Sequence, residues 1–161
     1  MNEQIKKDLG KVKRFLDNRK IEFKVVGSIA LEVCGLPIGR QVDDIDLEVV
    51  CSNRQEEIFK ALAEAQGNNF FEQSDYSIKG CSHKPYIFQF GKTNVNVWCF
   101  KEFSSPAYVE KDGMRYATVM DVLTKKLAYK RAKDFTDLLT IVSNLSTLGG
   151  IVGGNPGTPQ G

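Results

Sequence analysis

The hydrophobic pattern of the N-terminal third switches between helical and strand periodicity. Apolar residues at helical spacing predict an amphipathic helix over residues 3–18, with an inner face formed by Ile5, Leu9, Val12 and Phe15. The next stretch, IEFKVVGS, predicts a strand that ends at a Gly27-Ser28 turn, and IALEVCGL predicts a short helix that ends at Gly35. A loop then leads to VDDIDLEVV, residues 42–50, which alternates as a strand does.

The pattern after this strand predicts a helix and then a run of strands. Ser52 and Gln55 have the spacing of a capping box, which begins a helix that ends at Gly67. Residues 70–116 are typical of strands. The segments YIFQF and TNVNVWCF are separated by the dipeptide GK, which suits a type II′ hairpin turn with glycine first. The segments AYVEK and MRYA are separated by the dipeptide DG and predict a second hairpin.

Two helices and a tail are predicted at the C-terminal end. Thr118 with Asp121 begins a helix through VLTKKLAYK. A final helix is indicated by apolar residues at helical spacing, namely Phe135, Leu138, Leu139, Val142 and Leu145. Residues 147–161, TLGGIVGGNPGTPQG, hold six of the fourteen glycines and two prolines, so no regular element is expected there. We expect a flexible tail, or alternatively an ordered arm that docks on a partner.

Together these elements predict one α/β (α+β) domain over residues 1–146, built as a small mixed, largely antiparallel sheet flanked by helices. A chain of 161 residues that is 42% hydrophobic and 26% charged is typical of a globular protein with one core. The N-terminus is polar, and no stretch reaches the ~18–20 apolar residues of a membrane span, so we expect a cytoplasmic protein with no membrane partner. The sequence does not indicate the oligomeric state.

The cysteines and the histidine do not predict a metal site. Cys34, Cys51, Cys81 and Cys99 are scattered without a C-x-x-C pair. We expect reduced thiols, most of them acting as small buried hydrophobes. The only histidine, His83, lies in GCSHKP, and Cys81 with His83 falls far short of a ligand set. We expect His83 in a surface loop.

Acidic residues follow one face of the strand VDDIDLEVV. Asp44, Asp46 and Glu48 recur at period two, and Asp43 points to the opposite face, where it is either exposed or paired with an arginine. Carboxylates on this face stand about 6–7 Å apart, which at an effective dielectric near 20 is a repulsion of roughly 2–3 kcal/mol. A divalent cation at Asp44 and Asp46 relieves it, since Mg²⁺ is usually bound by one or two carboxylates plus substrate phosphates. The alternative for the acid pair is a solvent-facing edge strand. Glu48, one step further along this face, is either a neighbour of the site or a solvated strand end.

Two further segments suit an anionic ligand. The Gly27-Ser28 turn offers unhindered backbone N–H groups and a hydroxyl, although a plain strand-to-helix turn capped by Ser28 accounts for it equally well. The net charge is only +2, so a phosphate ligand needs a local basic cluster. Five cations in nine residues form one: Lys125, Lys126, Lys130, Arg131 and Lys133. The alternative is a solvated helix face balanced by Asp121, Asp134 and Asp137.

These segments, taken in order, resemble the nucleotidyltransferase superfamily with the DNA polymerase β-like fold, in its minimal single-domain form. The Gly27-Ser28 turn followed by Asp44-Ile45-Asp46 resembles the superfamily signature. Arg40 is similar to the arginine that small members carry ahead of D-x-D, although Val42 replaces their threonine. The segment KKLAYKRAKDFTDLL resembles the run that closes small abortive-infection toxin and antibiotic-modifying members. Its matching positions are Lys126, Arg131, Lys133, Asp134 and Asp137.

The resemblance implies an NTP bound with Mg²⁺, and transfer of a nucleoside monophosphate to a hydroxyl of a protein, RNA or small molecule. It implies Asp44, Asp46 and Asn96 as catalytic positions, with Asp44 and Asp46 as metal ligands. The nucleotide-binding positions that it implies are Gly27, Ser28, Arg40, Lys126, Lys130, Arg131 and Lys133. Asp134 and Asp137 are expected to fix helix ends and arginines.

One position departs from the superfamily pattern. A third carboxylate usually stands on the strand beside D-x-D, and here that position is most simply Asn96, with Asn94 as the other candidate on the same face. An amide can lend an oxygen to Mg²⁺ but cannot accept a proton from an attacking hydroxyl. Two function classes therefore follow: an active transferase, and a nucleotide-binding or interaction module without turnover.

Overall fold

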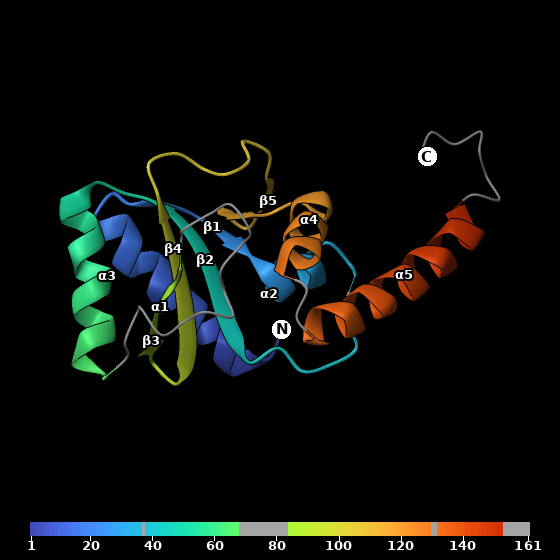
Figure 1. Cartoon of the computed structure of the whole chain (residues 1–161), viewed down its shortest axis with the longest axis horizontal. Coiled ribbons are helices and arrows are strands. Elements are labelled where there is room, and N and C mark those ends of the chain that lie inside the picture. The colour runs from blue at the N-terminus through green and yellow to red at the C-terminus, as the bar shows by residue number, and fades with distance from the viewer. Residues whose placement is uncertain (37, 68–83, 130–131, 153–161) are drawn as a thin grey trace.

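The computed structural model describes residues 1–36, 38–67, 84–129 and 132–152. Within them a mixed sheet has the strand order β3-β4-β2-β1-β6-β5 (Figure 1). The strands are β1 (Glu22–Val26), β2 (Asp44–Val50), β3 (Tyr86–Phe90), β4 (Thr93–Phe100), β5 (Val109–Lys111) and β6 (Met114–Tyr116). The helices are α1 (Glu3–Asn18), α2 (Gly27–Val33), α3 (Asn53–Ala65), α4 (Val119–Tyr129) and α5 (Ala132–Val152).

The central strand β2 runs antiparallel to β1 and parallel to β4, and the hairpins β3–β4 and β5–β6 widen the sheet on either side. Strand β6 pairs with β1 in parallel. Three of these five pairings are antiparallel, which confirms the predicted mixed, largely antiparallel sheet.

Helices cover both faces of the sheet. Figure 1 shows α1 and α3 on one side and α2, α4 and α5 on the other. Successive side chains of β2 point to opposite faces of the sheet. Ile45, Leu47 and Val49 are buried in the apolar core on one face, and the acidic residues of β2 lie on the other face. Phe59 of α3 stacks on Phe88 of β3 and so fixes that helix to the core.

The predicted local signals are confirmed by backbone geometry. Ser52 and Gln55 form a complete capping box at the start of α3. In the β3–β4 turn Gly91 has φ 66°, and Lys92 is not among the residues with positive φ, as a type II′ turn requires. In the β5–β6 turn Asp112 and Gly113 have φ 52° and 75°, which is the type I′ pattern.

A buried aspartate ties α1 to the β3–β4 turn. Asp8 is fully buried and accepts hydrogen bonds from Thr93 Oγ1 (2.6 Å) and from the Lys92 amide (3.0 Å). A Cβ at Gly91 would overlap Asp8 Oδ1. Glycine is therefore required at this turn for the approach of Asp8 as well as for its positive φ.

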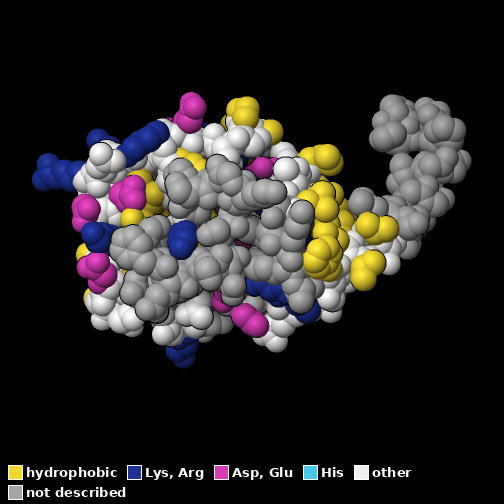
Figure 2. Space-filling view, viewed as in Figure 1, with side chains coloured by type: hydrophobic (Ala, Val, Ile, Leu, Met, Phe, Trp, Pro, Cys, Tyr) yellow, Lys and Arg dark blue, Asp and Glu magenta, His cyan; other side chains and the backbone are white. Residues whose placement is uncertain are grey.

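Helix α5 forms as predicted, but three of the apolar residues that indicated it are exposed. Phe135, Leu139 and Val142 are 53%, 71% and 60% exposed, whereas Asp137 and Ile141 are fully buried. The helix is turned because Asp137 pairs with cations on two other segments, as described below. Figure 2 shows hydrophobic side chains gathered on the surface over α4 and α5.

Helix α5 also extends further than the sequence indicates. It continues through Val152, so residues 147–152 are helical although their glycine content led us to expect no regular element. Residues 153–161 lie outside the described residues, as does the predicted loop residue His83. No helix in the described part of the chain is long and apolar enough to cross a membrane.

Candidate active site

Asp44 and Asp46 lie at the start of β2, where the strand meets α2, α4 and β4. Asp46 is paired with Val26 on β1 and with Asn96 on β4, and Asp44 is paired with Asn94. Both carboxylates are half-buried, and both face a pocket of about 700 Å³, a volume that includes its open mouth. The predicted acidic face of β2 therefore lines a cavity and is not a solvated edge.

The turn between β1 and α2 is pressed against Asp46. Gly27 has φ 69°, and a Cβ at this position would overlap Asp46 Oδ2 and lie 3.2 Å from its Cγ. Both the positive φ and the contact with Asp46 favour glycine over any residue that carries a Cβ. Ser28 follows as the second residue of α2 and is half-buried. The Gly-Ser pattern in the sequence thus marks the place where the backbone approaches a candidate site carboxylate most closely.

Asn96 completes this end of the pocket. It is 3% exposed, and its Nδ2 donates a hydrogen bond of 2.7 Å to Asp46 Oδ1. Asn94 lies opposite Asp44 and is exposed. Asn96 is therefore the amide that contacts the acidic pair.

Burial disfavours the ionised forms of the Asp44 and Asp46 carboxyl groups. Burial raises the pKa of Asp46, the Asn96 hydrogen bond opposes that effect, and the charge of Asp44 raises the pKa further. Burial likewise raises the pKa of Asp44, while the positive charge of Lys133 opposes it. In both cases the net shift is upward, so each carboxylate holds a proton more tightly than an exposed aspartate does.

Glu48, the third acid on this face, is in a different environment. It is 1% exposed and accepts hydrogen bonds from the Ser104 amide (2.7 Å) and from Lys125 Nζ (2.6 Å). Burial raises its pKa, but the charge and hydrogen bond of Lys125 and the bonds from Ser104 outweigh that effect, so its pKa is lowered. A solvated strand end at Glu48 is therefore wrong. Glu48 is a buried, ionised anchor at the pocket wall.

The predicted basic residues Arg40 and Lys126 are held by one buried carboxylate. Arg40 donates two hydrogen bonds to Asp137, of 3.0 and 2.9 Å, and Lys126 Nζ lies 2.9 Å from Asp137 Oδ2 and 3.7 Å from Asp134 Oδ1. This network joins the loop before β2, α4 and α5. Lys126 is buried, so a solvated helix face does not describe it.

The remaining walls of the pocket are mixed. The apolar part comes from Trp98, Phe100 and Val122, and Lys125 and the exposed Lys133 bring positive charge from the α4 and α5 side. Sequence reasoning did not single out the aromatic wall, although Trp98 shares the strand face of Asn96 and the period-two pattern was sufficient to place it there.

The structure brings most of the predicted site residues together. Gly27, Asp44, Asp46, Asn96, Lys126 and Lys133 line one pocket. Arg40 is not among the lining residues, and Asp137 links it to Lys126, which is. Lys130 and Arg131 lie outside the described residues.

The comparisons with known proteins support the fold. No family model and no curated protein matches the sequence. The solved structure of the antibiotic-resistance factor ANT(2'')-Ia matches with a TM-score of 0.56 and 15% identity, over 90% of this chain and 86% of that chain. An antigenic nucleotidyltransferase-like protein from Paracoccidioides brasiliensis matches with a TM-score of 0.49 and 17% identity, over 88% and 75% of the two chains. A candidate nucleotidyltransferase from H. pylori matches with a TM-score of 0.44 and 15% identity, over 86% and 68%. The match to ANT(2'')-Ia shows that the chain has the nucleotidyltransferase fold that its motifs resemble.

Proposed function

We propose that the protein is a nucleotidyltransferase that binds an NTP with Mg²⁺ and moves a nucleoside monophosphate to a hydroxyl of a protein, RNA or small molecule. The observation that carries this proposal is the pocket that Asp44 and Asp46 line together, with Asp46 against the backbone of Gly27. It supports the proposal because it occurs in a chain with the nucleotidyltransferase fold.

The donor set at Asp44 and Asp46 fits Mg²⁺. Both side chains offer hard oxygen atoms on one strand face, and burial raises the pKa of both carboxyl groups. A bound divalent cation supplies positive charge that relieves this cost and polarises phosphate oxygens. Asn96 orients one oxygen of Asp46 through its hydrogen bond, which leaves the other carboxylate oxygens for a ligand.

The other pocket residues bind and orient the nucleotide. Trp98 and Phe100 offer an apolar wall that suits a base or a sugar, and Lys133 brings positive charge toward the acidic end, where the phosphates of the nucleotide belong. Asp137 holds Arg40 and Lys126 and so fixes α4 and α5 around the site. A nucleotide held in this way would present its α-phosphate to an acceptor at the open mouth of the pocket.

The transfer is an in-line displacement at phosphorus. The acceptor oxygen forms a bond to the α-phosphorus, and the bond from that phosphorus to the bridging oxygen breaks, so pyrophosphate leaves with the electron pair. The hydroxyl proton passes to solvent, because the cation held by Asp44 and Asp46 would lower the basicity of both carboxylates. Asn96 cannot take this proton, since an amide has no basic site at neutral pH.

A second function is favoured by this same residue. Asn96 donates to Asp46 at the position where the superfamily usually has a third carboxylate, which suits a protein that binds nucleotide without turnover. In that case the Mg²⁺ and nucleotide contacts stay as proposed and only the chemical step is lost.

Transfer of label from a panel of α-labelled NTPs with Mg²⁺, to protein, RNA and small hydroxyl compounds, tests the enzyme proposal. We expect label transfer by the wild type that is lost in Asp46→Asn and kept in Asp43→Asn, because Asp43 is an exposed neighbour that lines no part of the pocket. Nucleotide binding without any transfer supports the binding module. The absence of both nucleotide binding and label transfer would contradict both functions.

A further inference from the structure

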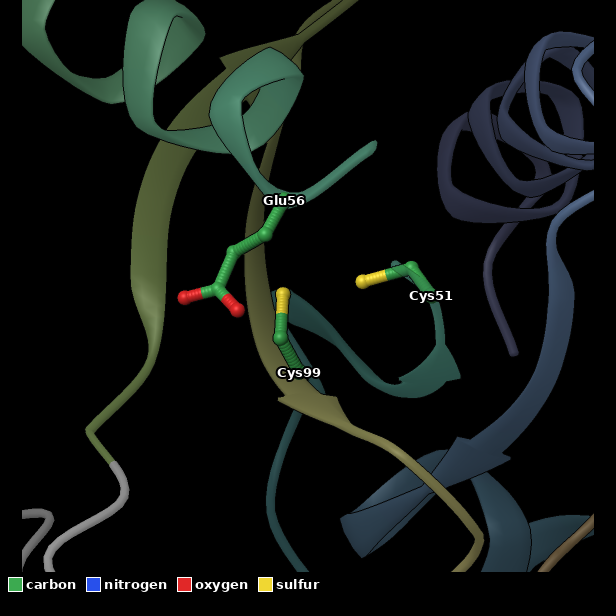
Figure 3. A group of neighbouring side chains, drawn as sticks. All are labelled: Cys51, Glu56 and Cys99. Carbon is green, nitrogen blue, oxygen red and sulfur yellow. The ribbon is translucent and has the colours of Figure 1, made fainter. Parts of the chain in front are cut away.

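A second group of ligand-type side chains lies away from the acidic pocket. The sulfur atoms of Cys51 and Cys99 and a carboxylate oxygen of Glu56 all lie within 4.8 Å of one another (Figure 3). Cys51 follows β2, Cys99 belongs to β4, and Glu56 stands in the first turn of α3. Three separate elements therefore deliver one donor atom each to the same place.

The sheet separates this group from the candidate active site. On β4 the residues Asn96, Trp98 and Phe100 line the pocket, and Cys99 alternates to the other face. On the strand beside it, Val49 is paired with Cys99 and lies in the core that α1 and α3 cover. A ligand at the cysteines thus has no access to Asp44 or Asp46.

The carboxylate distinguishes this group from an ordinary pair of core cysteines. Cys51 and Cys99 are buried, and buried cysteine usually packs among apolar side chains. Here one oxygen of a half-buried carboxylate lies beside the Cys99 thiol, and the Tyr86 hydroxyl donates a 2.6 Å hydrogen bond to Glu56 Oε2. Such a bond to one oxygen orients a carboxylate for a ligand at the other, as outer hydrogen bonds do in metal sites.

The nearby charge also suits a divalent cation. Lys101 Nζ contacts the backbone oxygen of Cys51 and the side chain of Asn53, so its positive charge stands beside the group. Two thiolates and one carboxylate carry three negative charges. A divalent cation together with the lysine balances them, which matters in a buried setting where uncompensated charge is costly.

We propose that Cys51, Cys99 and Glu56 form a binding site for a thiophilic divalent cation, with Zn²⁺ as the natural occupant. Sulfur donors favour Zn²⁺ over Mg²⁺, and three protein ligands leave a fourth tetrahedral position for water or an outside ligand. Glu56 is half-buried, which gives an entry path at the rim. A cation there ties the start of α3 to β2 and β4.

Titration of the reduced full-length protein with Co²⁺ tests the proposal, because thiolate–Co²⁺ coordination gives a near-ultraviolet charge-transfer band that oxygen ligands cannot produce. We expect one equivalent of Co²⁺ to generate this band and Zn²⁺ to abolish it. Cys51→Ser and Cys99→Ser should lose the band, and Glu56→Gln should weaken Co²⁺ binding at least tenfold. The matched control is Cys34→Ser, a free cysteine elsewhere in the fold, which should keep it. Asp44→Asn should also keep it, because the two sites are independent.

A second measurement covers variants that fail to fold. Alkylation of the wild type with iodoacetamide, mapped by peptide mass, should be slowed by Zn²⁺ at Cys51 and Cys99 and unchanged at Cys34. The proposal is overturned by equal alkylation with and without Zn²⁺, or by Co²⁺ binding that Glu56→Gln does not alter. A mild oxidant that joins Cys51 to Cys99 in a protein with no Co²⁺ band overturns it as well, and assigns the pair to redox chemistry.

Discussion

Asn96 on β4 donates a 2.7 Å hydrogen bond to Asp46 on β2, at positions that lie directly opposite in the parallel pair. An amide in this position satisfies one carboxylate oxygen without adding charge. A carboxylate there would instead form a third negative group beside two whose pKa values are already raised. A carboxylate in place of Asn96 would therefore lower the metal-free stability and raise the capacity for proton transfer.

Asn96→Asp should lower stability without metal and raise metal-dependent activity. The added charge joins an acidic pair in repulsion, so the metal-free melting temperature should fall. With Mg²⁺ and NTP the new carboxylate supplies a base, which is typically worth 10²–10⁴-fold in rate. Thermal unfolding and label transfer measure the two effects. Asn94→Asp is the matched control, and the same pattern there in place of Asn96→Asp would move the third position two residues along β4.

Gly27→Ala should cost more stability than Gly35→Ala. Both glycines have positive φ, at 69° and 84°, so both substitutions carry the left-handed backbone cost of roughly 1–2 kcal/mol. Only at position 27 would the new Cβ overlap Asp46, whereas nothing lies within 4 Å at position 35. Urea denaturation measures the difference, and nucleotide affinity should fall only in Gly27→Ala. Equal effects on stability would mean that the turn can move away from Asp46.

The acidic pair should give metal-free stability a distinctive dependence on pH. Because the folded pKa of Asp46 is raised, the native state binds more protons than the unfolded state above the ordinary pKa of aspartate, so this residue's contribution falls as pH rises from about 4 through the raised value. Asp46→Asn should therefore gain stability relative to wild type as pH increases over that window, and then level off. Denaturation of wild type and Asp46→Asn at several pH values without metal tests this, and a difference that does not change with pH would contradict it.

Asp137→Asn should destabilise the protein strongly. The change leaves Lys126 buried without its closest carboxylate and removes the paired contact to Arg40, and breaking a buried pair typically costs about 3–5 kcal/mol. Burial raises the pKa of Asp137, but its hydrogen bonds from Arg40 and Lys126 outweigh this and lower it, so its contribution is present above the ordinary aspartate pKa and is lost on acidification. Acid denaturation of wild type and variant should therefore converge at low pH.

Lysine substitutions separate phosphate binding from structural pairing. Lys133 lines the pocket and is exposed, so Lys133→Ala should weaken binding of a triphosphate more than that of a monophosphate. Lys126→Ala tests the role that the resemblance implies. A selective loss for the triphosphate assigns Lys126 to the phosphates, and equal losses assign it to the pairing with Asp137. Calorimetric titration of both variants with each ligand measures the difference.

The sequence was most informative where the signal is local. The period-two pattern of β2 predicted which face carries Asp44 and Asp46, and the glycine positions predicted both hairpins and the type II′ turn of the first. These features depend on neighbours in the chain. The close approach of Gly27 to Asp46 was also within reach, because a Gly-Ser turn and an acidic strand in order are a known combination.

Contacts between distant segments were not predictable from pattern alone. The sequence did not show which face of α5 is buried, because the partner of Asp137 is Arg40, 97 residues earlier in the chain. The sequence left Glu48 as either a neighbour of the site or a solvated end, because its partners Ser104 and Lys125 come from later segments. The group of Cys51, Glu56 and Cys99 depends on the parallel register of β2 and β4, which spacing in the sequence does not fix.

The most direct test of the central claim is the Mg²⁺-dependent stabilisation of the protein by a non-hydrolysable NTP analogue, followed by chemical denaturation in wild type and Asp44→Asn. With the analogue at a hundred times its dissociation constant, the wild type should gain about 2.7 kcal/mol. The gain should require Mg²⁺ and should disappear in Asp44→Asn. An equal gain in Asp44→Asn, or one that does not depend on Mg²⁺, would contradict the assignment of Asp44 and Asp46 as the metal–nucleotide site.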